Sequence, residues 1–403
     1  MSQYSNEVPE RTMGIDLGDR KSRWCWIDRA GEVVSEGKIA TTPEALGKRF
    51  GSIDRCRMVI ENGTHSRWVK RELERMGHEV VVANPRKVRL ISHNEKKCDR
   101  LDPILLARLG RVDVHLLYPV QFRSDVAQAD VAVLKARDAL VRVRTKLINC
   151  IRGTVKATGH RLRKCSAESF VRQCQLQIPL TLRSALEPLF ETIQQVNQQI
   201  KFYDRKVEHL CQEKYPETKW LMQVTGVGSI TALAYVLVIE KPERFARSRQ
   251  VGPFLGLTPR QDQSGEQDPQ LHITKAGNSF LRRLLVNSAQ YVMHKGPECD
   301  LRNAGARIAL QGGKRAKKRA VVAVTRRLSV LLHHLWANQL TYDPHYNRKK
   351  QEERAKQTTY VLAFDGQRIE HSAGVQVQGT APLRSAPAGE RRRSVRCKSR
   401  QKG

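Results

Sequence analysis

The sequence of 403 residues lacks the features that mark several classes of protein. It has no apolar run of about 18 residues, which argues against a membrane-spanning helix, and its first twelve residues lack the apolar core of a secretory signal. Its nine cysteines include no C-x-x-C pair, the usual mark of zinc or redox sites. We therefore expect a cytoplasmic protein, with no membrane partner, whose thiols are reduced.

Acidic residues are also scarce, with 40 Asp and Glu against 72 Lys and Arg and a formal net charge of +32. Such a chain repels itself unless a polyanion lies nearby, and nucleic acid is the first candidate. The length is enough for at least two cores, because one domain usually takes about 100 to 200 residues. Charge alone does not separate an enzyme from a ribosomal or chromatin-type binding protein.

The first third of the chain has an α/β pattern that suits a mixed sheet covered by helices. Apolar stretches and turn residues predict a strand over 12–28, an antiparallel partner over 31–41 across a turn at Gly31, a helix over 43–50, a strand over 56–62, a helix over 66–76 and a strand over 79–84.

Two heptad seams predict long helices in the middle of the chain. The first seam consists of Val126, Ala129, Val133, Ala136, Leu140, Val143, Leu147 and Cys150. The second consists of Leu186, Leu189, Ile193, Val196, Ile200, Tyr203, Val207 and Leu210. A basic connector over 152–172 joins them. The pattern fits a helix hairpin within one subunit and a contact between subunits equally well.

The pattern changes again after the second seam. Helical segments with Gly-rich turns fill the region from about 220 to 338, and residues beyond 346 are poor in apolar and rich in basic side chains. The predicted parts are a disordered N-terminus at 1–11, an α/β domain at 12–122, a coiled-coil hairpin at 123–215, a mainly α C-terminal domain at 216–342 and a basic disordered tail at 343–403.

Four acidic residues form a candidate metal site. Asp16 and Glu61 lie within apolar strands, where a charged side chain is costly unless a cation or metal pairs with it. Asp99 and Asp102 are three residues apart at the start of a predicted helix, on one face of it. Carboxylates from two strands and a helix are the hard ligands that Mg²⁺ prefers. The alternative for Asp99 and Asp102 is a favourable position at a helix N-terminus.

Several motifs resemble one known family. They are GIDLG with Asp16, VIEN with Glu61 and CDRLDPILLARL with Asp99 and Asp102, followed by QVTGVGSITALAYV, FLGLTPRQDQSGEQ, HITKAGNSFLRRLLV and GGKRAKKRAVVAVTRRL. In this order, over residues 13–340, they resemble bacterial insertion-sequence transposases that have an N-terminal Asp-Glu-Asp-Asp (DEDD) domain of the RuvC-like, ribonuclease H type and a C-terminal transposase domain.

The resemblance implies a fold, a chemistry and partners. It implies that a bridge RNA guides excision and insertion of DNA, that Ser264 in QDQSGEQ is the catalytic serine, and that the serine of one subunit completes the acidic site of another in a dimer or tetramer. From the residues alone, Ser264 is also explained as a solvated turn serine beside the flexible Gly265. No G-x-S-x-G elbow is present to activate a serine by the route of hydrolases. Ser279 fits a helix cap or first-turn position better.

Basic and glycine-rich segments of the C-terminal part predict phosphate contacts. Gly226 and Gly228 precede an apolar helix and could present backbone N–H groups to a phosphate, or form a plain turn. The predicted basic contacts are Lys275, Arg282, Arg283, Lys314, Arg315, Lys317, Lys318 and Arg319. Charges of this density bind phosphates with little sequence reading. His333 and His334 fit packing or interface positions in an apolar helix.

The leading hypothesis is an RNA-guided DNA transposase. In it Asp16, Glu61, Asp99 and Asp102 bind Mg²⁺ and Ser264 attacks the scissile phosphate of the DNA. The first alternative is a RuvC-like, structure-selective nuclease that uses water. The second is a non-catalytic nucleic-acid-binding protein in which the carboxylates are structural.

Overall fold

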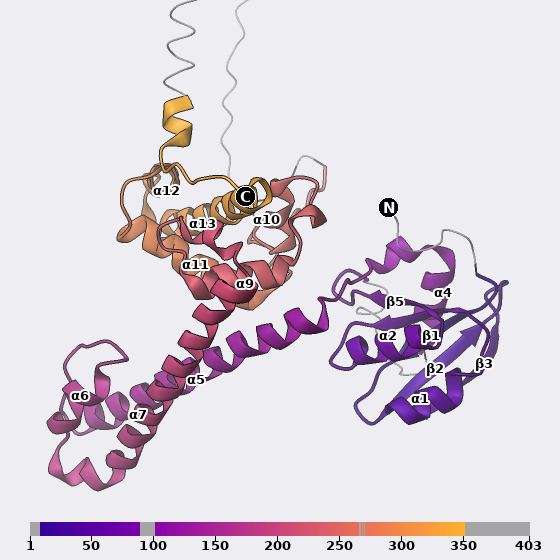
Figure 1. Ribbon diagram of the computed structural model, residues 1–403, viewed down its shortest axis with the longest axis horizontal. Helices are drawn as coiled ribbons and strands as arrows, with labels where there is room; N and C mark the ends of the chain where they lie inside the picture. The colour runs from indigo at the N-terminus through magenta and orange to yellow at the C-terminus, as the bar shows by residue number, and fades with distance from the viewer. Residues whose placement is uncertain (1–8, 89–100, 266, 268, 270, 351–403) are drawn as a thin grey trace, which may run out of the picture. The chain divides into compact units, whose positions relative to one another are not determined.

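The computed structural model describes residues 9–88, 101–265, 267, 269 and 271–350 (Figure 1). The chain forms two compact units, Met1–Pro216 with Leu233–Arg244 and Glu217–Ala232 with Phe245–Gly403. In the part of the chain that is described, no helix combines the length and the apolarity needed to cross a bilayer. Residues 1–8 of the predicted N-terminal segment at 1–11 and residues 351–403 of the predicted tail at 343–403 lie outside the described residues.

A five-stranded mixed sheet forms the first domain. Its strands are β1 (Thr12–Asp16), β2 (Lys21–Ile27), β3 (Val33–Ala40), β4 (Arg57–Glu61) and β5 (Glu79–Ala83), in the order β3-β2-β1-β4-β5. The pairs β1–β2 and β2–β3 are antiparallel, whereas β1–β4 and β4–β5 are parallel. The predicted mixed α/β arrangement, with the first strand paired to the strand after the helix, is confirmed.

The prediction of one strand over 12–28 was wrong, because this segment folds back on itself as β1 and β2. The turn between them contains Gly18, whose carbonyl accepts a hydrogen bond from the Thr41 hydroxyl at 2.9 Å. The polar Gly-Asp sequence in this segment is a turn signal between two apolar stretches. The break matters for function because it makes Asp16 the last residue of a strand.

One face of the sheet is covered by the helices α1 (Pro43–Phe50) and α2 (Ser66–Arg75), which confirms both predicted helices to within a residue. Thr42 caps α1 by accepting a hydrogen bond from the Ala45 amide, and Pro43 suits the first turn. Alternate residues of β1 and β4 pack under these helices, among them Ile15 and Ile60, which are fully buried.

The opposite face of the sheet is covered by α4 (Leu101–Val112), with the short 3-10 helix η1 (Val114–Leu117) after it. The contact is close because two glycines remove side chains from it. A β-carbon at Gly14 of β1 would lie 1.9 Å from the Pro103 carbonyl oxygen, and one at Gly110 of α4 would lie 2.3 Å from a methyl carbon of Val59. The α4 backbone therefore rests directly on β1.

The middle of the chain is a helix hairpin, made of α5 (Asp125–Ala157) and α7 (Leu180–His209) with the short helix α6 (Phe170–Cys174) between them. The two long helices run antiparallel, because Asp130 near the start of α5 accepts a hydrogen bond from Tyr215 beyond α7, whereas Arg144 further along α5 donates to Asn197. The predicted intrachain hairpin is confirmed, and a contact between subunits stays a prediction.

The predicted seam of α7 is confirmed, whereas the predicted seam of α5 was wrong by one residue. None of its eight residues is buried, and Val126 is 56% exposed. The apolar residues that are buried on α5 are Ala127, Val131, Leu134, Ile148, Ile151 and Val155. This seam also contains Asp130 and Arg144, which are hydrogen-bonded to Tyr215 and Asn197 across the hairpin. These polar residues interrupt its apolar pattern.

The second unit is helical, as predicted. Its elements are α8 (Thr218–Met222), part of α9 (Ser229–Ile239), α10 (Val251–Phe254), α11 (Ser279–His294), α12 (Asp300–Ala309) and α13 (Gly313–Asn338), together with the 3-10 turn η5 (Ser248–Gln250). The turn η4 (Pro242–Arg244) belongs to the first unit. The helix α13 packs against α8, α10, α11 and α12 and buries Val324, Leu328 and Leu332. Residues 346–350, at the start of the predicted disordered tail, are helical.

Replacing Gly14 with Ala tests the contact between α4 and β1. The added methyl would overlap the Pro103 carbonyl, and overpacking of this kind costs about 1–3 kcal/mol or more. We expect chemical denaturation to show that Gly14→Ala lowers the free energy of unfolding by an amount in that range. Gly63→Ala is the control, because nothing lies within 4 Å of its added carbon. Equal stabilities for the two variants would contradict the close contact.

Candidate active site and nucleic-acid interface

Asp16 and Glu61 end adjacent parallel strands of the sheet. Asp16 is the last residue of β1 and Glu61 is the last residue of β4, and the register pairs the preceding residues Ile15 and Ile60. Parallel strands have their carboxyl ends at the same edge of a sheet. The two acidic residues, 45 positions apart in the sequence, therefore occupy neighbouring positions at one edge, as predicted.

Strand periodicity places both residues on the face that α4 covers. Side chains alternate between faces, so Asp16 shares a face with Gly14, and Glu61 shares a face with Val59. Gly14 and Val59 both contact α4. Asp102 lies in the first turn of α4, next to Pro103, whose carbonyl rests on Gly14. Two strand ends and one helix start thus meet at one corner of the domain.

The donor set at this corner suits a hard divalent cation, because all three side chains offer carboxylate oxygens. Asp99, the fourth predicted ligand, lies outside the described residues. Within the part of the chain that the structure describes, no three His, Cys, Asp or Glu side chains gather closely enough to hold a metal ion. The fold accordingly brings the three positions to one corner without forming a closed ligand cluster from them alone.

Ser264 lies at the tip of an exposed hairpin in the second unit. Pro259 and Ile273 pair at the base of this loop, and Ser264 pairs with Gln267 through backbone hydrogen bonds of 3.2 and 3.1 Å. Between them Gly265 has φ +56°, a left-handed conformation that glycine adopts without strain. Among the described residues, no histidine or carboxylate is hydrogen-bonded to the Ser264 hydroxyl. The serine is exposed.

The two glycines of the TGVGS segment have different surroundings. Gly226 has φ +91° and packs against α11, where an added β-carbon would lie 3.0 Å from Tyr291. Gly228 is exposed, has open space around it, and its carbonyl accepts the first hydrogen bond of α9, from Ala232. Gly226 therefore forms a packed turn, and the accessible backbone of this segment is at Gly228.

The predicted basic contacts around α11 fall into two groups, one at the surface and one that holds a loop in place. Lys275 is exposed and Arg283 lies over the ring of Phe280, 5.5 Å from its centroid. Arg282 instead donates to the carbonyls of Leu255 at 2.9 Å and Ala276 at 2.8 Å. Arg282 therefore braces the loop before α11, whereas Lys275 and Arg283 lie at the surface.

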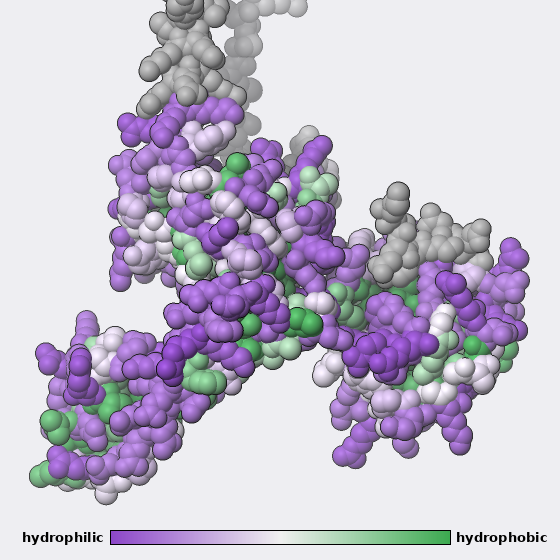
Figure 2. Space-filling view, in the orientation of Figure 1, coloured by the Kyte–Doolittle hydropathy of each residue, from purple (hydrophilic) through white to green (hydrophobic). Residues whose placement is uncertain are grey.

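The five basic residues at the start of α13 all lie at the surface. Lys314, Arg315, Lys317, Lys318 and Arg319 are exposed, and the alanines between them are buried. The visible face of this unit is largely hydrophilic (Figure 2). Cations at a helix N-terminus face the positive end of the helix dipole, which is unfavourable unless an anion is near. This arrangement is typical of a surface that binds phosphates.

The structure tests the predictions for His333, His334 and Ser279. His334 is exposed, so it is not a packing residue within the chain. His333 is buried, with its Nδ1 2.9 Å from the Ser248 hydroxyl and its ring against Phe245, so the predicted packing role is confirmed. Ser279 is the first residue of α11, whereas Asn278 provides the cap by accepting from the Leu281 amide. His333, Asn278 and Ser279 are structural.

Sequence reasoning missed a basic surface on α2. Arg67, Arg71 and Arg75 are spaced four residues apart and so share one side of the helix. Arg67 and Arg71 both form ion pairs with Asp125, at 2.8 and 3.1 Å. The spacing was visible in the sequence, but nothing in the sequence pattern joined it to Asp125.

Two parts of the chain match known protein families. Residues 13–159 match a transposase family described as the DEDD transposases of IS110, and residues 218–302 match the transposase family IS116/IS110/IS902. A transposase of insertion sequence element IS1111A from Coxiella burnetii is 27% identical over 347 residues, which is 82% of this chain and 91% of that protein. A transposase of element IS1328 from Yersinia enterocolitica is 25% identical over 72% of this chain and 86% of that protein.

The mixed sheet with its acidic corner, the helical remainder and these matches define a DNA transposase with a DEDD-type N-terminal domain. Within that class, residues 218–302 are similar to the IS116/IS110/IS902 transposases and residues 13–159 to the DEDD transposases of IS110.

The basic start of α13 gives a prediction for DNA binding. Each lysine that contacts a phosphate contributes about 1 to the slope of log affinity against log salt. We expect Lys317→Gln with Lys318→Gln to lower this slope by about 2 in a fluorescence anisotropy titration of duplex DNA. The control pair, Lys219→Gln with Lys295→Gln, removes two exposed charges from the same unit and should leave the slope unchanged. A slope that responds equally to both pairs would contradict a localised interface.

Proposed function

We propose that this transposase excises and inserts an insertion sequence by metal-assisted transesterification with Ser264 as the nucleophile, guided by a bridge RNA. The observation that carries the proposal is the meeting of Asp16, Glu61 and Asp102 at one corner of the sheet. A purely structural role would not require three acidic positions at the same end of two strands and a helix.

The corner supports binding of Mg²⁺ by these three residues together with Asp99. All four supply hard oxygen ligands, and Mg²⁺ takes such ligands in octahedral geometry. Bound there, the cations would stabilise negative charge on a scissile phosphate and orient it. The chain's own contribution is to fix the positions of Asp16 and Asp102 relative to each other, which the contact between α4 and Gly14 maintains.

The proposed covalent step uses the exposed hydroxyl of Ser264. Its oxygen attacks the scissile phosphorus, a serine–phosphate ester forms, and the bond to a deoxyribose oxygen breaks. That oxygen leaves with the electron pair and takes up a proton, while the serine proton passes to solvent or a base. Because one ester replaces another, the reverse attack by a different DNA end rejoins the strands without an external energy source.

Delivery of the serine to the acidic corner is proposed to come from another copy of the chain, in a dimer or tetramer. Support comes from the first predicted seam, which is not buried in the hairpin and leaves Val126 56% and Val143 42% exposed on α5. An apolar stripe of this kind suits a contact between copies. Dense exposed cations bind phosphates with little reading of base edges, which suits a protein whose target sequence is read by RNA pairing.

Substitution of Asp102 with Asn tests the metal role. The amide keeps the shape of the side chain but loses the charge, and metal stabilisation of the transition state amounts to several kcal/mol. We expect the rate of strand exchange to fall about 100-fold or more, with DNA binding largely retained. Asp54→Asn, a change at a residue whose side chain is 91% exposed, is the control. Undiminished recombination by Asp102→Asn would refute the metal role.

Substitution of Ser264 with Ala tests the nucleophile. A serine ester with DNA survives denaturation, so the native protein should give a shifted band with labelled DNA on a denaturing gel. We expect this adduct to disappear in Ser264→Ala and to persist in Ser279→Ala, which removes another exposed serine from the same unit. Cleavage that continues without an adduct in the native protein would favour the alternative nuclease that uses water.

A further inference from the structure

A groove with a basic wall lies where α2 faces the segment that leads into α5. It has a volume of about 500 Å³. Four cationic side chains line it, from Arg67, Lys70, Arg71 and Arg123, against the two carboxylates of Glu74 and Asp125. The groove belongs to the first unit and lies among residues that the proposed serine chemistry does not use.

The floor of the groove is anchored to the core of the sheet domain. Trp68, Val120 and Phe122 line the groove and also pack against the buried cluster under α1 and α2. The amide of Val120 donates to the carbonyl of Val82 in β5 at 2.9 Å. Both walls are therefore fixed to one sheet, which keeps the spacing of the cations constant.

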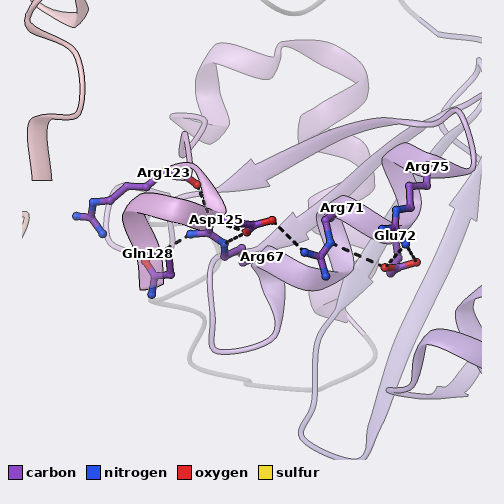
Figure 3. Close-up of polar contacts among 7 residues, drawn as sticks. All are labelled: Arg67, Arg71, Glu72, Arg75, Arg123, Asp125 and Gln128. Carbon is purple, nitrogen blue, oxygen red and sulfur yellow. Dashed lines mark hydrogen bonds and ion pairs between the residues drawn. The ribbon is translucent and has the colours of Figure 1, made fainter. Parts of the chain in front are cut away.

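Two arginines of the groove converge on a single carboxylate. Arg67 donates to one oxygen of Asp125 at 2.8 Å and Arg71 donates to the other at 3.1 Å (Figure 3). These hydrogen bonds hold the pKa of Asp125 below its usual range, so it carries a charge at neutral pH. Asp125 is thus an anion held between two guanidinium groups, as a phosphate would be.

Stability does not account for the pairing of Arg71 with Asp125. The side chains of Asp125 and Arg71 are 64% and 53% exposed, and ion pairs between exposed groups contribute between nothing and about 1 kcal/mol. An exposed carboxylate exchanges readily with another anion that approaches from solvent. The arrangement instead keeps two arginines oriented at a surface while nothing else is bound.

The remaining charges of the groove add to its preference for anions. Lys70 pairs with Glu74, which balances those two charges. Arg123 extends away from Asp125, and its Nε has no hydrogen-bond partner among the described residues (Figure 3). Burial, followed by the nearby charge of Arg244, lowers the pKa of Arg123, whereas Glu240 opposes this shift. With one aspartate shared by two arginines, and Arg123 besides, the groove keeps an excess of positive charge.

We propose that this groove binds the phosphodiester backbone of a nucleic acid, with Arg67 and Arg71 on a phosphate and Asp125 as the internal anion that the phosphate displaces. The proposal rests on the proposed function only in taking nucleic acid as the partner. It adds a contact in the first unit, separate from both the acidic corner and the basic start of α13.

Replacing Asp125 tests the proposal, because the direction of the change in nucleic-acid affinity depends on whether Asp125 competes with phosphate. If Asp125 competes with phosphate, Asp125→Asn removes the competitor and should tighten binding a few-fold. If the ion pairs only hold α2 to α5, the same substitution should leave binding unchanged or weaken it. Arg71→Gln should weaken binding and lower the salt slope by about 1.

The experiment measures fluorescence anisotropy of the full-length protein across a salt series, with a 30-base-pair duplex DNA in one arm and an RNA hairpin in the other. The matched control is Arg75→Gln, which removes the same charge one turn along α2, where Arg75 pairs with Glu72 outside the groove (Figure 3). Because Arg67 also donates to the backbone carbonyl of Arg123, Arg71→Gln is the safer variant for folding.

The expected result is a lower slope for Arg71→Gln and tighter binding for Asp125→Asn, in at least one arm, with Arg75→Gln like the native protein. The arm that responds identifies the groove's partner as DNA or RNA. The proposal is overturned if neither arm responds, if Arg75→Gln has the same effect as Arg71→Gln, or if Asp125→Asn leaves binding unchanged or weakens it. The serine adduct assay reports on the proposed function independently, since it requires no change in this groove.

Discussion

The structure of the first domain depends on the contact between the backbone of α4 and Gly14 of β1. Only a residue without a side chain allows the Pro103 carbonyl to reach the strand, and this approach sets the position of the first turn of α4. Asp102 lies in that turn, and Asp16 lies two residues beyond Gly14 on the same face. Gly14 thereby fixes where the carboxylate of α4 lies relative to the two carboxylates of the strands. The acidic corner is a consequence of this close packing.

Positive charge is used in three different ways along the chain. The cations at the start of α13 are exposed and have no acidic residue in the first turn of their helix, which makes that helix end attractive to an anion. On α2, by contrast, Arg67 and Arg71 share Asp125, which orients them in advance. Arg282 serves a third purpose, since its guanidinium holds two loop carbonyls. A large net charge therefore gives the class of partner, whereas the contacts of each residue give its role.

Much of the fold could be predicted from sequence because the signals were local. The helix at 43–50 has a cap, a first-turn proline and apolar spacing, and its bounds agree with the structure. The seam of α7 is an unbroken apolar pattern and was placed correctly. The seam of α5 was misplaced because Asp130 and Arg144 interrupt it, and only their partners across the hairpin explain why polar residues are buried there. The strand over 12–28 was wrong because a tight turn at Gly18 leaves only a short polar interruption.

The candidate site shows the same division between local and long-range information. Acidic residues within apolar strands are a strong local signal, and the parallel pairing of β1 with β4 brings Asp16 and Glu61 to one edge. Sequence alone could not separate Arg282 from Arg283, because one of the two carbonyls that bind Arg282 belongs to Leu255, 27 residues away. Nor could it find the groove on α2, since the pairing of Arg71 with Asp125 joins residues 54 positions apart.

The central claim is that the corner formed by Asp16, Glu61 and Asp102 holds a divalent cation. A crystal structure of the protein with Mn²⁺, examined for anomalous scattering, tests it most directly. We expect a manganese peak at the carboxyl ends of β1 and β4, with oxygens of these residues about 2.0–2.2 Å from it. Manganese bound only at other positions, with these carboxylates directed away from one another at saturating metal, would contradict it.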